Sequence, residues 1–526
     1  MATMRPLLAF LICLLFIQTS FSQEFTRSEL DLDLAQPWEM TYGPDDFLWI
    51  TQANGIVTRV NPETGNSTNV FVASDYFGGA LSEASPHCTN PKIGFGTLGL
   101  TLHPDFLNPE NAFIYYFYSY NSGTEIEPAT KFKIKRLKWN AGTETIIDST
   151  DLIENIPTSY DHLGGRLLAV EQDNRTFLYL SIGDHGLSEE NSPTCYPDQT
   201  ENPNNWAQDP TTMNGKVHRF NIDGSIPYDN PIAGNSFFTR GHRNPQGLMY
   251  DSSTDRIFVI EHGDRTDDEI NVLSAGKNYG WKHVRGYHDG NHPNELSFIE
   301  NYVPYPTIEN DALIEAFYSW CTSPVTDNPD NSNWCTVAPS DGIYYCNYAI
   351  PQWNNSLLVV TLKDGEGTDK EVYQFKLQVN GELMPSTDEN PNPKRFFGDD
   401  QVLNGRLKDI AISPDGTKIY LLNSGGAPTS KVIVYTLDPN SVTTFQASEE
   451  NCLNVFPNPA SHNIRLEGIN LLEDVEAIKI FGANGQLIQI VPIDCYAIDI
   501  SNLAEGTYTI NVYYKDGICS SKFIKS

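Results

Sequence analysis

The chain has 526 residues and a formal net charge of −33 at pH 7, with 67 acidic residues against 34 Lys and Arg. This length allows a large domain with an accessory unit, and a hydrophobic content of 39% is typical of a soluble globular protein. The excess of acid argues against nucleic acid and anionic membrane surfaces as partners, because phosphates are bound by basic faces.

The N-terminus has the pattern of an export signal. Arg5 precedes an apolar run over residues 7–17, and Ser20 and Ser22 are small residues at the two positions that a signal peptidase reads. We predict a signal peptide over residues 1–22. An uncleaved anchor is the alternative, but the run is short for a membrane span, and no later segment is apolar enough to cross a bilayer.

Cysteine usage fits an oxidising compartment. Of the 9 cysteines, export removes Cys13 and leaves an even number, which permits disulfides. No CxxC pair occurs, which argues against a zinc site built from thiolates. Cys321 and Cys335 flank a loop rich in Pro, Asp and Asn, and we predict a disulfide between them; the other pairings stay open.

One pattern recurs along most of the chain: a polar turn, then a β-rich apolar run, then a polar or glycine-containing stop. The apolar runs lie at residues 47–50, 113–116, 177–180, 257–260, 357–360 and 419–422. Each unit is typical of the turn and inner strand of a β-hairpin. We therefore predict an all-β protein with a six-bladed β-propeller over residues 23–445. A pair of β-sandwiches is the alternative, which the recurrence disfavours.

Strand ends in such a fold should bring distant residues together. Equivalent strands of a propeller run the same way, so their ends emerge on one face. Four polar segments follow apolar runs in this way: residues 183–186, 261–264, 362–363 and 423–424. We expect them to converge around the central axis.

The last part of the chain has a different texture. A Phe-Pro-Asn-Pro stretch at residues 456–459 is followed by an Asn-Gly-Gln turn at 484–486 and a Leu-x-x-Gly-x-Tyr segment at 503–508. Together they resemble the C-terminal sorting domain of type IX secretion substrates. The resemblance implies a small β-sandwich domain over residues 446–526, export by the type IX secretion machinery of a Gram-negative bacterium, and a secreted or cell-surface location. A carbohydrate-binding or Ig-like module is the alternative.

Two segments carry side chains suited to chemistry. Asp161 and His162 begin a glycine-bearing turn, where an imidazole could act as a general base and Asp161 could orient it. Alone, that motif is better explained as a turn histidine that caps a strand, because neighbouring His and Asp residues are common. Residues 241–247 and 261–271 place a cation, an amide and an acidic cluster around one short strand, which suits an anionic ligand beside a metal.

Seven short motifs occur in one order, at residues 102–106, 161–167, 182–186, 214–217, 241–247, 267–271 and 276–281. Their order resembles the soluble quinoprotein glucose dehydrogenases and aldose sugar dehydrogenases, the glucose/sorbosone dehydrogenases, over roughly residues 35–440. The resemblance implies a six-bladed propeller, calcium ions and pyrroloquinoline quinone (PQQ).

PQQ is a flat ortho-quinone with three carboxylates, so several cations are needed to hold it. The resemblance assigns these cations to Arg243, Lys363, Arg406 and Lys408, with an amide from Asn244. The family usually has Arg at the position of Lys408; Lys keeps the charge but loses the fork, so cofactor affinity is expected to differ.

The resemblance also implies two calcium sites. The backbone carbonyls of Gly263 and Asp264 would hold the ion that touches the quinone, with Asp264 at a position that usually carries proline. The carbonyls of Arg285 and Tyr287 and the side chain of Asp289 would hold a structural ion. A distant carboxylate completes that second site, with Glu309 and Glu315 both possible, and an ordinary polar turn is the alternative.

The mechanism that the resemblance implies starts with His162, which takes a proton from the anomeric hydroxyl of an aldose. A hydride passes to the quinone, calcium and Arg243 stabilise the developing charge, and the product is a lactone. Electrons then leave to an external acceptor. His262, where the family often has Gln, is expected to line the pocket.

Other functions stay open at this point. A non-catalytic secreted propeller could bind a carbohydrate or protein, although it would have no reason to keep the base and the cations in register. A calcium-dependent lactone hydrolase would need a carboxylate-rich metal centre on the axis. Gly94 stands where glucose-oxidising members have Gln, which leaves the identity of the sugar open. The sequence also leaves open the oligomeric state and whether the tail stays attached.

Overall fold

The computed structural model describes residues 24–438 and 453–526, apart from 79–96, 125–128, 159–160, 187–201, 204, 265, 321–335, 348, 351, 364–369, 379, 389, 425–429, 468–474, 484, 492–497, 502 and 515–516. The predicted signal peptide, Gly94 and the predicted Cys321–Cys335 pair lie outside the described residues and stay predictions. Cys346 and Cys519 are each disulfide-bonded.

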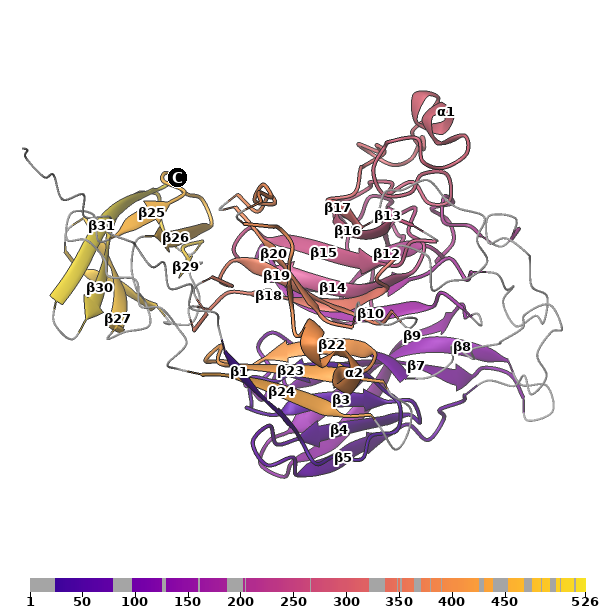
Figure 1. The fold of residues 1–526 in the computed structure, drawn as a ribbon, viewed down its shortest axis with the longest axis horizontal. Coiled ribbons are helices and arrows are strands. Elements are labelled where there is room, and N and C mark those ends of the chain that lie inside the picture. The colour runs from indigo at the N-terminus through magenta and orange to yellow at the C-terminus, as the bar shows by residue number, and fades with distance from the viewer. Residues whose placement is uncertain are drawn as a thin grey trace, which may run out of the picture.

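Strands dominate the described chain, so the all-β prediction is confirmed (Figure 1). Before residue 438 they form six four-stranded antiparallel sheets. The first three, in chain order, are β2 (Pro37–Tyr42), β3 (Leu48–Gln52), β4 (Ile56–Val60) and β5 (Ser67–Val72); then β6 (Thr97–Leu102), β7 (Phe113–Asn121), β8 (Thr130–Asn140) and β9 (Thr145–Ile156); then β10 (Gly164–Gln172), β11 (Arg175–Ile182), β12 (Lys216–Asn221) and β13 (Phe237–Arg240).

The other three sheets have the same order of strands. They are β14 (Pro245–Asp251), β15 (Arg256–Glu261), β16 (Asp268–Val272) and β17 (Tyr318–Trp320); then β18 (Pro339–Tyr345), β19 (Ser356–Thr361), β20 (Val372–Lys376) and β21 (Lys394–Phe396); and last β22 (Leu407–Ile412), β23 (Lys418–Asn423) and β24 (Val432–Leu437), completed by β1 (Phe25–Glu29). Since β1 pairs with β24, strands from both ends of this region share the sixth sheet. Short helices occur in loops: α1 (Glu295–Glu300), η3 (Gly398–Asp400) and α2 (Gln401–Asn404).

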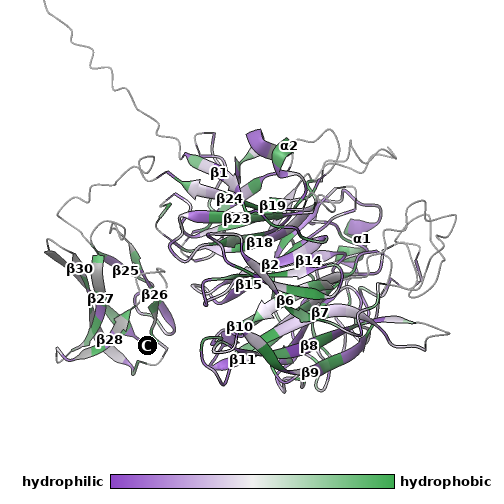
Figure 2. Cartoon of the chain, turned by 90° about the horizontal axis from the view of Figure 1, so that it is seen from below, coloured by the Kyte–Doolittle hydropathy of each residue, from purple (hydrophilic) through white to green (hydrophobic). Residues whose placement is uncertain are grey.

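The six sheets form a closed ring. The first strand of each sheet packs against the first strand of the next, and β22 packs against β2. Apolar side chains fill the spaces between neighbouring sheets; one such layer joins Trp49 to Tyr116 and Leu137. In Figure 2 hydrophobic colour follows the strands and hydrophilic colour gathers in the turns.

The apolar runs seen in the sequence were predicted to form inner strands. They form instead the second strand of each sheet: β3, β7, β11, β15, β19 and β23. Second strands are buried on both faces and therefore read as continuous apolar runs. The first strands line the axis and carry polar residues, which hid them from a search for apolar runs. The predicted convergence is kept, because the end of each second strand lies beside the start of its first strand.

The chain ends in a separate β unit. One sheet contains β25 (Asn454–Phe456), β26 (Asn463–Glu467) and β29 (Ile498–Asp499), and the other β28 (Leu487–Val491), β27 (Val475–Gly482), β30 (Gly506–Tyr514) and β31 (Gly517–Lys525). Its core includes Ile464, Ile480 and Phe523, all fully buried. Within the described residues no helix has the length and apolar character needed to cross a membrane.

Candidate active site

The predicted base His162 lies just before β10 and is paired with a carboxylate from the next strand. Its Nδ1 atom is 2.7 Å from Oδ1 of Asp184, which follows β11 and is fully buried. A Cβ at Gly183 would come within 1.9 Å of the carbonyl oxygen of His162, so only glycine allows these two chain segments to approach. The backbone N–H of Asp184 also donates to the carbonyl of Arg243 at 2.8 Å, which joins a third segment.

Asp184 accepts hydrogen bonds on both oxygens. Oδ1 accepts from the backbone N–H of Gly186 at 2.8 Å, and Oδ2 accepts from Trp281 Nε1 at 2.6 Å and Asn205 Nδ2 at 3.0 Å. Burial alone would raise the pKa of Asp184, but the His162 ring, Arg243 and Gly186 hold that pKa below its usual value. An ionised Asp184 fixes the His162 ring with a proton on Nδ1, which leaves Nε2 to accept a proton.

Asp161, which the sequence suggested as the orienting carboxylate, lies differently. Its side chain is half exposed, and Oδ2 is 3.6 Å from Nε2 of His162. Its Oδ1 accepts from the backbone N–H of His162 at 2.9 Å. Asp161 therefore lies near the proton-accepting nitrogen, while Asp184 takes the orienting position.

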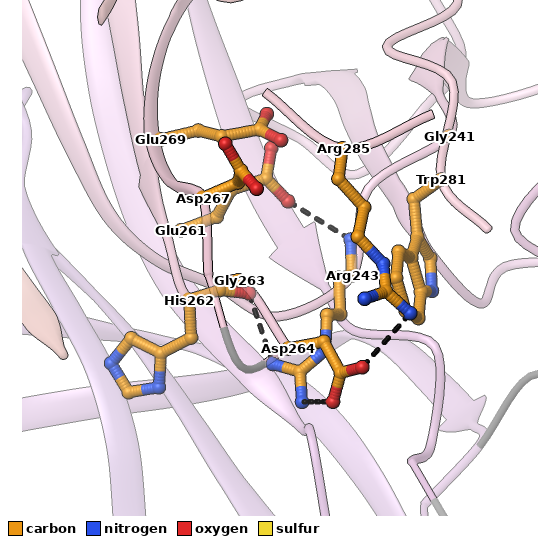
Figure 3. Close-up of a pocket in the computed structure, with 10 residues that line it drawn as sticks. All are labelled: Gly241, Arg243, Glu261, His262, Gly263, Asp264, Asp267, Glu269, Trp281 and Arg285. Atoms are coloured by element: carbon orange, nitrogen blue, oxygen red, sulfur yellow. Dashed lines mark hydrogen bonds and ion pairs between the residues drawn. The ribbon is translucent and has the colours of Figure 1, made fainter. Parts of the chain in front are cut away.

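Arg243 precedes β14 and projects toward the loop that follows β15 (Figure 3). Its Nη1 donates to the carbonyl of His262 at 3.0 Å, its Nη2 lies 4.0 Å from Asp264, and its backbone N–H donates to Glu261 at 2.9 Å. The neighbouring Asn244 is buried, and its Oδ1 accepts from Gln246 Nε2 at 2.8 Å and the backbone N–H of Gly164 at 3.3 Å. The amide NH₂ of Asn244 is thus oriented by the two strands that flank it.

Three of the predicted cofactor cations act on one residue. Burial lowers the pKa of His262 well below its ordinary value, and the charges of Arg243, Lys408 and Arg406, with the His162 ring, lower it further. The groups whose charges act on His262 therefore lie at the starts of β10, β14 and β22. Its Nε2 is buried and has no hydrogen-bond partner among the described residues.

The remaining residues predicted to bind the cofactor are placed by strands of the fifth and sixth sheets. Lys363 follows β19 and its backbone N–H donates to Val337 at 3.2 Å. Arg406 immediately precedes β22, and its carbonyl accepts from Ser424 at 2.9 Å. The ammonium of Lys408 lies 3.8 Å from the centroid of the Trp38 ring, so an aromatic face holds the charge.

The loop predicted to hold the first calcium is Gly263–Asp264, between β15 and β16. The backbone N–H of Gly263 donates to Asp268 at 2.8 Å, and the carboxylate of Asp264 lies 2.9 Å from Arg285. Burial raises the pKa of Asp268 to about 6. The Asp264 charge, which the family pattern lacks, is thus balanced by Arg285 and Arg243 (Figure 3).

The loop predicted to hold the second calcium is ringed by carboxylates. Glu269 accepts from the backbone N–H of Gly286 at 2.6 Å, and Glu295 from that of Arg285 at 3.0 Å. Glu315 accepts from the backbone N–H of His288 at 2.9 Å, between Tyr287 and Asp289. Of the two distant carboxylates left open, Glu315 is therefore the one hydrogen-bonded to this loop.

A small pocket joins the two loops. Arg243, Asp264, Trp281 and Arg285 line it, together with the acidic group Glu261, Asp267 and Glu269. Burial raises the pKa of Asp267 to about 6 and that of Glu269 well above its usual value. A buried acidic wall beside two arginines suits a site that holds a cation and an anion together.

Comparison with known protein families shows which families the two parts of the chain match. Residues 34–431 match the Glucose / Sorbosone dehydrogenase family model. The chain belongs to the glucose/sorbosone dehydrogenase family. Residues 454–526 match the Secretion system C-terminal sorting domain, in agreement with the resemblance seen in the tail.

Relatives of this glucose/sorbosone dehydrogenase family member cover most of its length. Quinoprotein glucose dehydrogenase B of Acinetobacter calcoaceticus is 29% identical over 469 residues, which are 80% of this chain and 89% of that protein. Aldose sugar dehydrogenase YliI of Escherichia coli K12 is 24% identical, over 81% of this chain and 96% of its own.

Solved structures share the fold at lower identity. PQQ-bound aldose sugar dehydrogenase from Streptomyces coelicolor aligns with a TM-score of 0.53 at 20% identity, over 79% of this chain and 99% of its own. The apo aldose sugar dehydrogenase of Escherichia coli aligns with a TM-score of 0.55 at 21% identity, over 79% of this chain and 100% of its own.

Two residues of the site escaped the sequence interpretation. Asp184 lies in a motif that the sequence had placed at a strand end, and the shared rim of equivalent strand ends was the available signal. Trp281 ends the motif at residues 276–281, and the sequence alone assigned it no role of its own. Its indole connects the two halves of the site, because Nε1 bonds to Asp184 and the ring lies 5.5 Å from Arg243 and 5.7 Å from Arg285.

Proposed function

We propose that the protein is an exported, PQQ- and calcium-dependent dehydrogenase that oxidises an aldose at the anomeric carbon to the lactone. The single observation that supports this most is that the base His162 and the cations Arg243, Arg406 and Lys408 all lie at the starts of first strands of one closed ring, in a chain of strongly negative net charge. Cations collected in so acidic a protein favour a polyanionic ligand.

The residues fit PQQ and calcium. The guanidinium and ammonium groups of Arg243, Arg406 and Lys408, at the starts of two strands, can pair with its three carboxylates. Lys363 and Asn244 lie at neighbouring strand ends, and the buried Nε2 of His262 offers one more polar contact. Gly263 and Asp264 would offer carbonyl oxygens to one calcium, and Arg285, Tyr287, Asp289 and Glu315 oxygens to a second. When bound, the quinone supplies the redox chemistry by accepting a hydride from the anomeric carbon.

The chain's own residues supply positioning and proton transfer. His162 accepts the proton of the anomeric hydroxyl on Nε2, and Asp184 stabilises the imidazolium that results. Arg243 places positive charge where negative charge develops. Asp161, close to the same Nε2, is placed to contact the sugar side of the base.

We interpret the ring of six sheets as a six-bladed β-propeller, and the tail as a small β-sandwich that directs type IX export to the cell surface or the medium. An external electron acceptor completes the cycle. The signal peptide and the domain limits at residues 22 and 445 belong to this proposal.

The alternatives are less well supported. A non-catalytic propeller gives no reason for a fully hydrogen-bonded Asp184 behind His162. A lactone hydrolase needs an axial metal held by carboxylates. Three carboxylates, Glu39, Asp341 and Asp409, do meet within 4.8 Å, but the guanidinium of Arg166 is paired with all three.

The test is reconstitution of the purified apoprotein with calcium and PQQ, followed by a dye-linked assay across aldoses. His162→Ala should lower the rate by at least ~10²-fold while quenching of tryptophan fluorescence still reports PQQ binding. Arg406→Ala should weaken PQQ binding by roughly tenfold. Lys418 pairs with Glu63 on the surface, so Lys418→Ala is the control and should leave PQQ binding unchanged. Activity without the quinone, or none with it, would overturn the proposal.

A further inference from the structure

All six inner strands carry an irregularity at the same level. The register with the second strand shifts between Pro37 and Met40, Thr97 and Leu100, Gly164 and Leu167, Pro245 and Gly247, Pro339 and Asp341, and Leu407 and Asp409. A bulge re-aims the side chains beside it. Six bulges at equivalent positions therefore point six short segments toward the axis of the ring.

Polar residues at these bulges meet in one cluster, which we call the axial hub: Glu39, Arg166, Gln246, Asp341 and Asp409. The guanidinium of Arg166 is only 3% exposed. Its Nη1 contacts Glu39 of β2, lies 3.2 Å from Asp341 of β18 and 2.9 Å from Asp409 of β22. Its Nε donates to the carbonyl of Gln246 in β14 at 2.9 Å.

The hub bonds strands of five sheets, and the remaining sheet packs against it. Arg166 itself belongs to β10, and Gly99 in β6 lies so close to that strand that a Cβ there would come within 2.3 Å of the carbonyl oxygen of Gly165. Asp409 also accepts from the backbone N–H of Met40 at 2.7 Å, which ties the sixth sheet to the first. One cation and three carboxylates thus connect the inner strands of five of the six sheets.

On three strands, a hub residue lies within four positions of a candidate-site residue in the sequence. Arg166 follows His162 by four residues, Gln246 follows Asn244 by two, and Asp409 adjoins Lys408. Gln246 also connects them directly, since its carbonyl accepts from Arg166 and its side chain donates to Asn244. The spacing of the strands that carry the base and the cations is therefore set at the hub.

We propose that Arg166 is a built-in cation on which the ring closes, and that it positions the strand starts of the candidate site by binding the three axial carboxylates. Without it, three buried carboxyl groups would share one site with no cation to balance the negative charge that they carry, a strongly destabilising arrangement. A charge of this kind is replaceable: a soluble guanidinium of matching shape should occupy the space left by a smaller side chain.

The experiment uses the full chain without cofactor, so its result does not depend on the proposed function. Arg166→Ala should lower the thermal unfolding midpoint by roughly 5–10 °C. Ethylguanidinium at low millimolar concentration should restore much of that loss with a saturable dependence, whereas tetramethylammonium at equal ionic strength should not. Arg166→Lys, which keeps the charge, should lose less than Arg166→Met.

Arg59→Ala is the matched control. Arg59 pairs with Asp45 at 2.9 Å and Glu144 at 3.0 Å on the outer part of the first sheet, so its loss should not be rescued by ethylguanidinium. If Arg166→Ala does not fold, Arg166→Met combined with Glu39→Gln, Asp341→Asn and Asp409→Asn should restore folding by removing the unpaired charges. An unchanged midpoint in Arg166→Ala, or a combined variant no better than Arg166→Met, would refute the proposal.

Discussion

Nδ1 of His162 lies 2.7 Å from Oδ1 of Asp184, and this carboxylate comes from a neighbouring strand, not from the residue beside the histidine in the chain. Because Asp184 is buried and Asp161 is half exposed, the two should contribute very differently. In the reconstituted enzyme, we expect Asp184→Asn to lower kcat by at least about 10²-fold, since the amide no longer stabilises the imidazolium. Asp161→Asn should lower kcat by less than about tenfold, because an exposed pair is screened by water. Equal losses in both variants would contradict this assignment.

The hydrogen bond from Trp281 to Asp184 can be tested separately from the aromatic ring. Trp281→Phe keeps an aromatic face beside Arg243 and Arg285 but removes the N–H that donates to Asp184 at 2.6 Å. We expect about a tenfold loss of kcat, the usual weight of a hydrogen bond to a charged group, with little change in PQQ affinity. Trp139→Phe, in an apolar layer between the first and second sheets, is the control and should leave kcat unchanged. A loss confined to cofactor affinity would show that the ring, not its N–H, matters.

The proposed second calcium site would be completed by one distant carboxylate. Glu315 is hydrogen-bonded to the backbone at His288. Glu315→Gln should therefore weaken one of the two calcium sites by roughly tenfold or more in calorimetric titration, and Glu309→Gln should not. Asp289→Asn should weaken the same site. If Glu309→Gln has the larger effect, the loop binds calcium in a different arrangement.

Stability should depend on pH through the axial hub. Burial raises the pKa of Glu39 to about 8 from an ordinary 4.5, and burial also raises that of Asp341, in a cluster where Asp409 adds negative and Arg166 positive charge. The folded protein thus holds protons that the unfolded chain has released, so the free energy of unfolding should fall as pH rises from about 5 to beyond about 8.

Urea unfolding at about pH 6 and about pH 8.5 measures this slope. Glu39→Gln should make the free energy of unfolding less dependent on pH, because the amide does not titrate. Glu144 is exposed and pairs with Arg59, so Glu144→Gln is the control. This variant should show the same dependence of the free energy of unfolding on pH as the parent protein. A free energy that rises over this range would show that the hub carboxyls are ionised in the folded state.

Much of this protein could be predicted from residue patterns that are local. Turn, apolar run and stop recur because a strand buried on both faces needs continuous apolar side chains, and that need is visible in one dimension. The ordered motifs that contain His162 and Arg243 resemble those of PQQ-dependent dehydrogenases, and the tail motifs resemble a sorting domain. Such resemblances can be seen without the fold because each motif is a short run of the chain.

What only the tertiary structure decided were pairings between strands. Asp184 replaces Asp161 as the partner of His162 because strand ends from β10 and β11 meet at one rim, so a residue 22 positions away lies closer to Nδ1 than the adjacent one. The axial hub is invisible in the sequence for a related reason. Its five residues lie in bulged first strands that look polar and irregular, and closure of the ring alone brings them together. The sequence determined which polar and charged groups the site can use. The closed ring determined which of them are buried together at low dielectric constant, where their charges interact strongly.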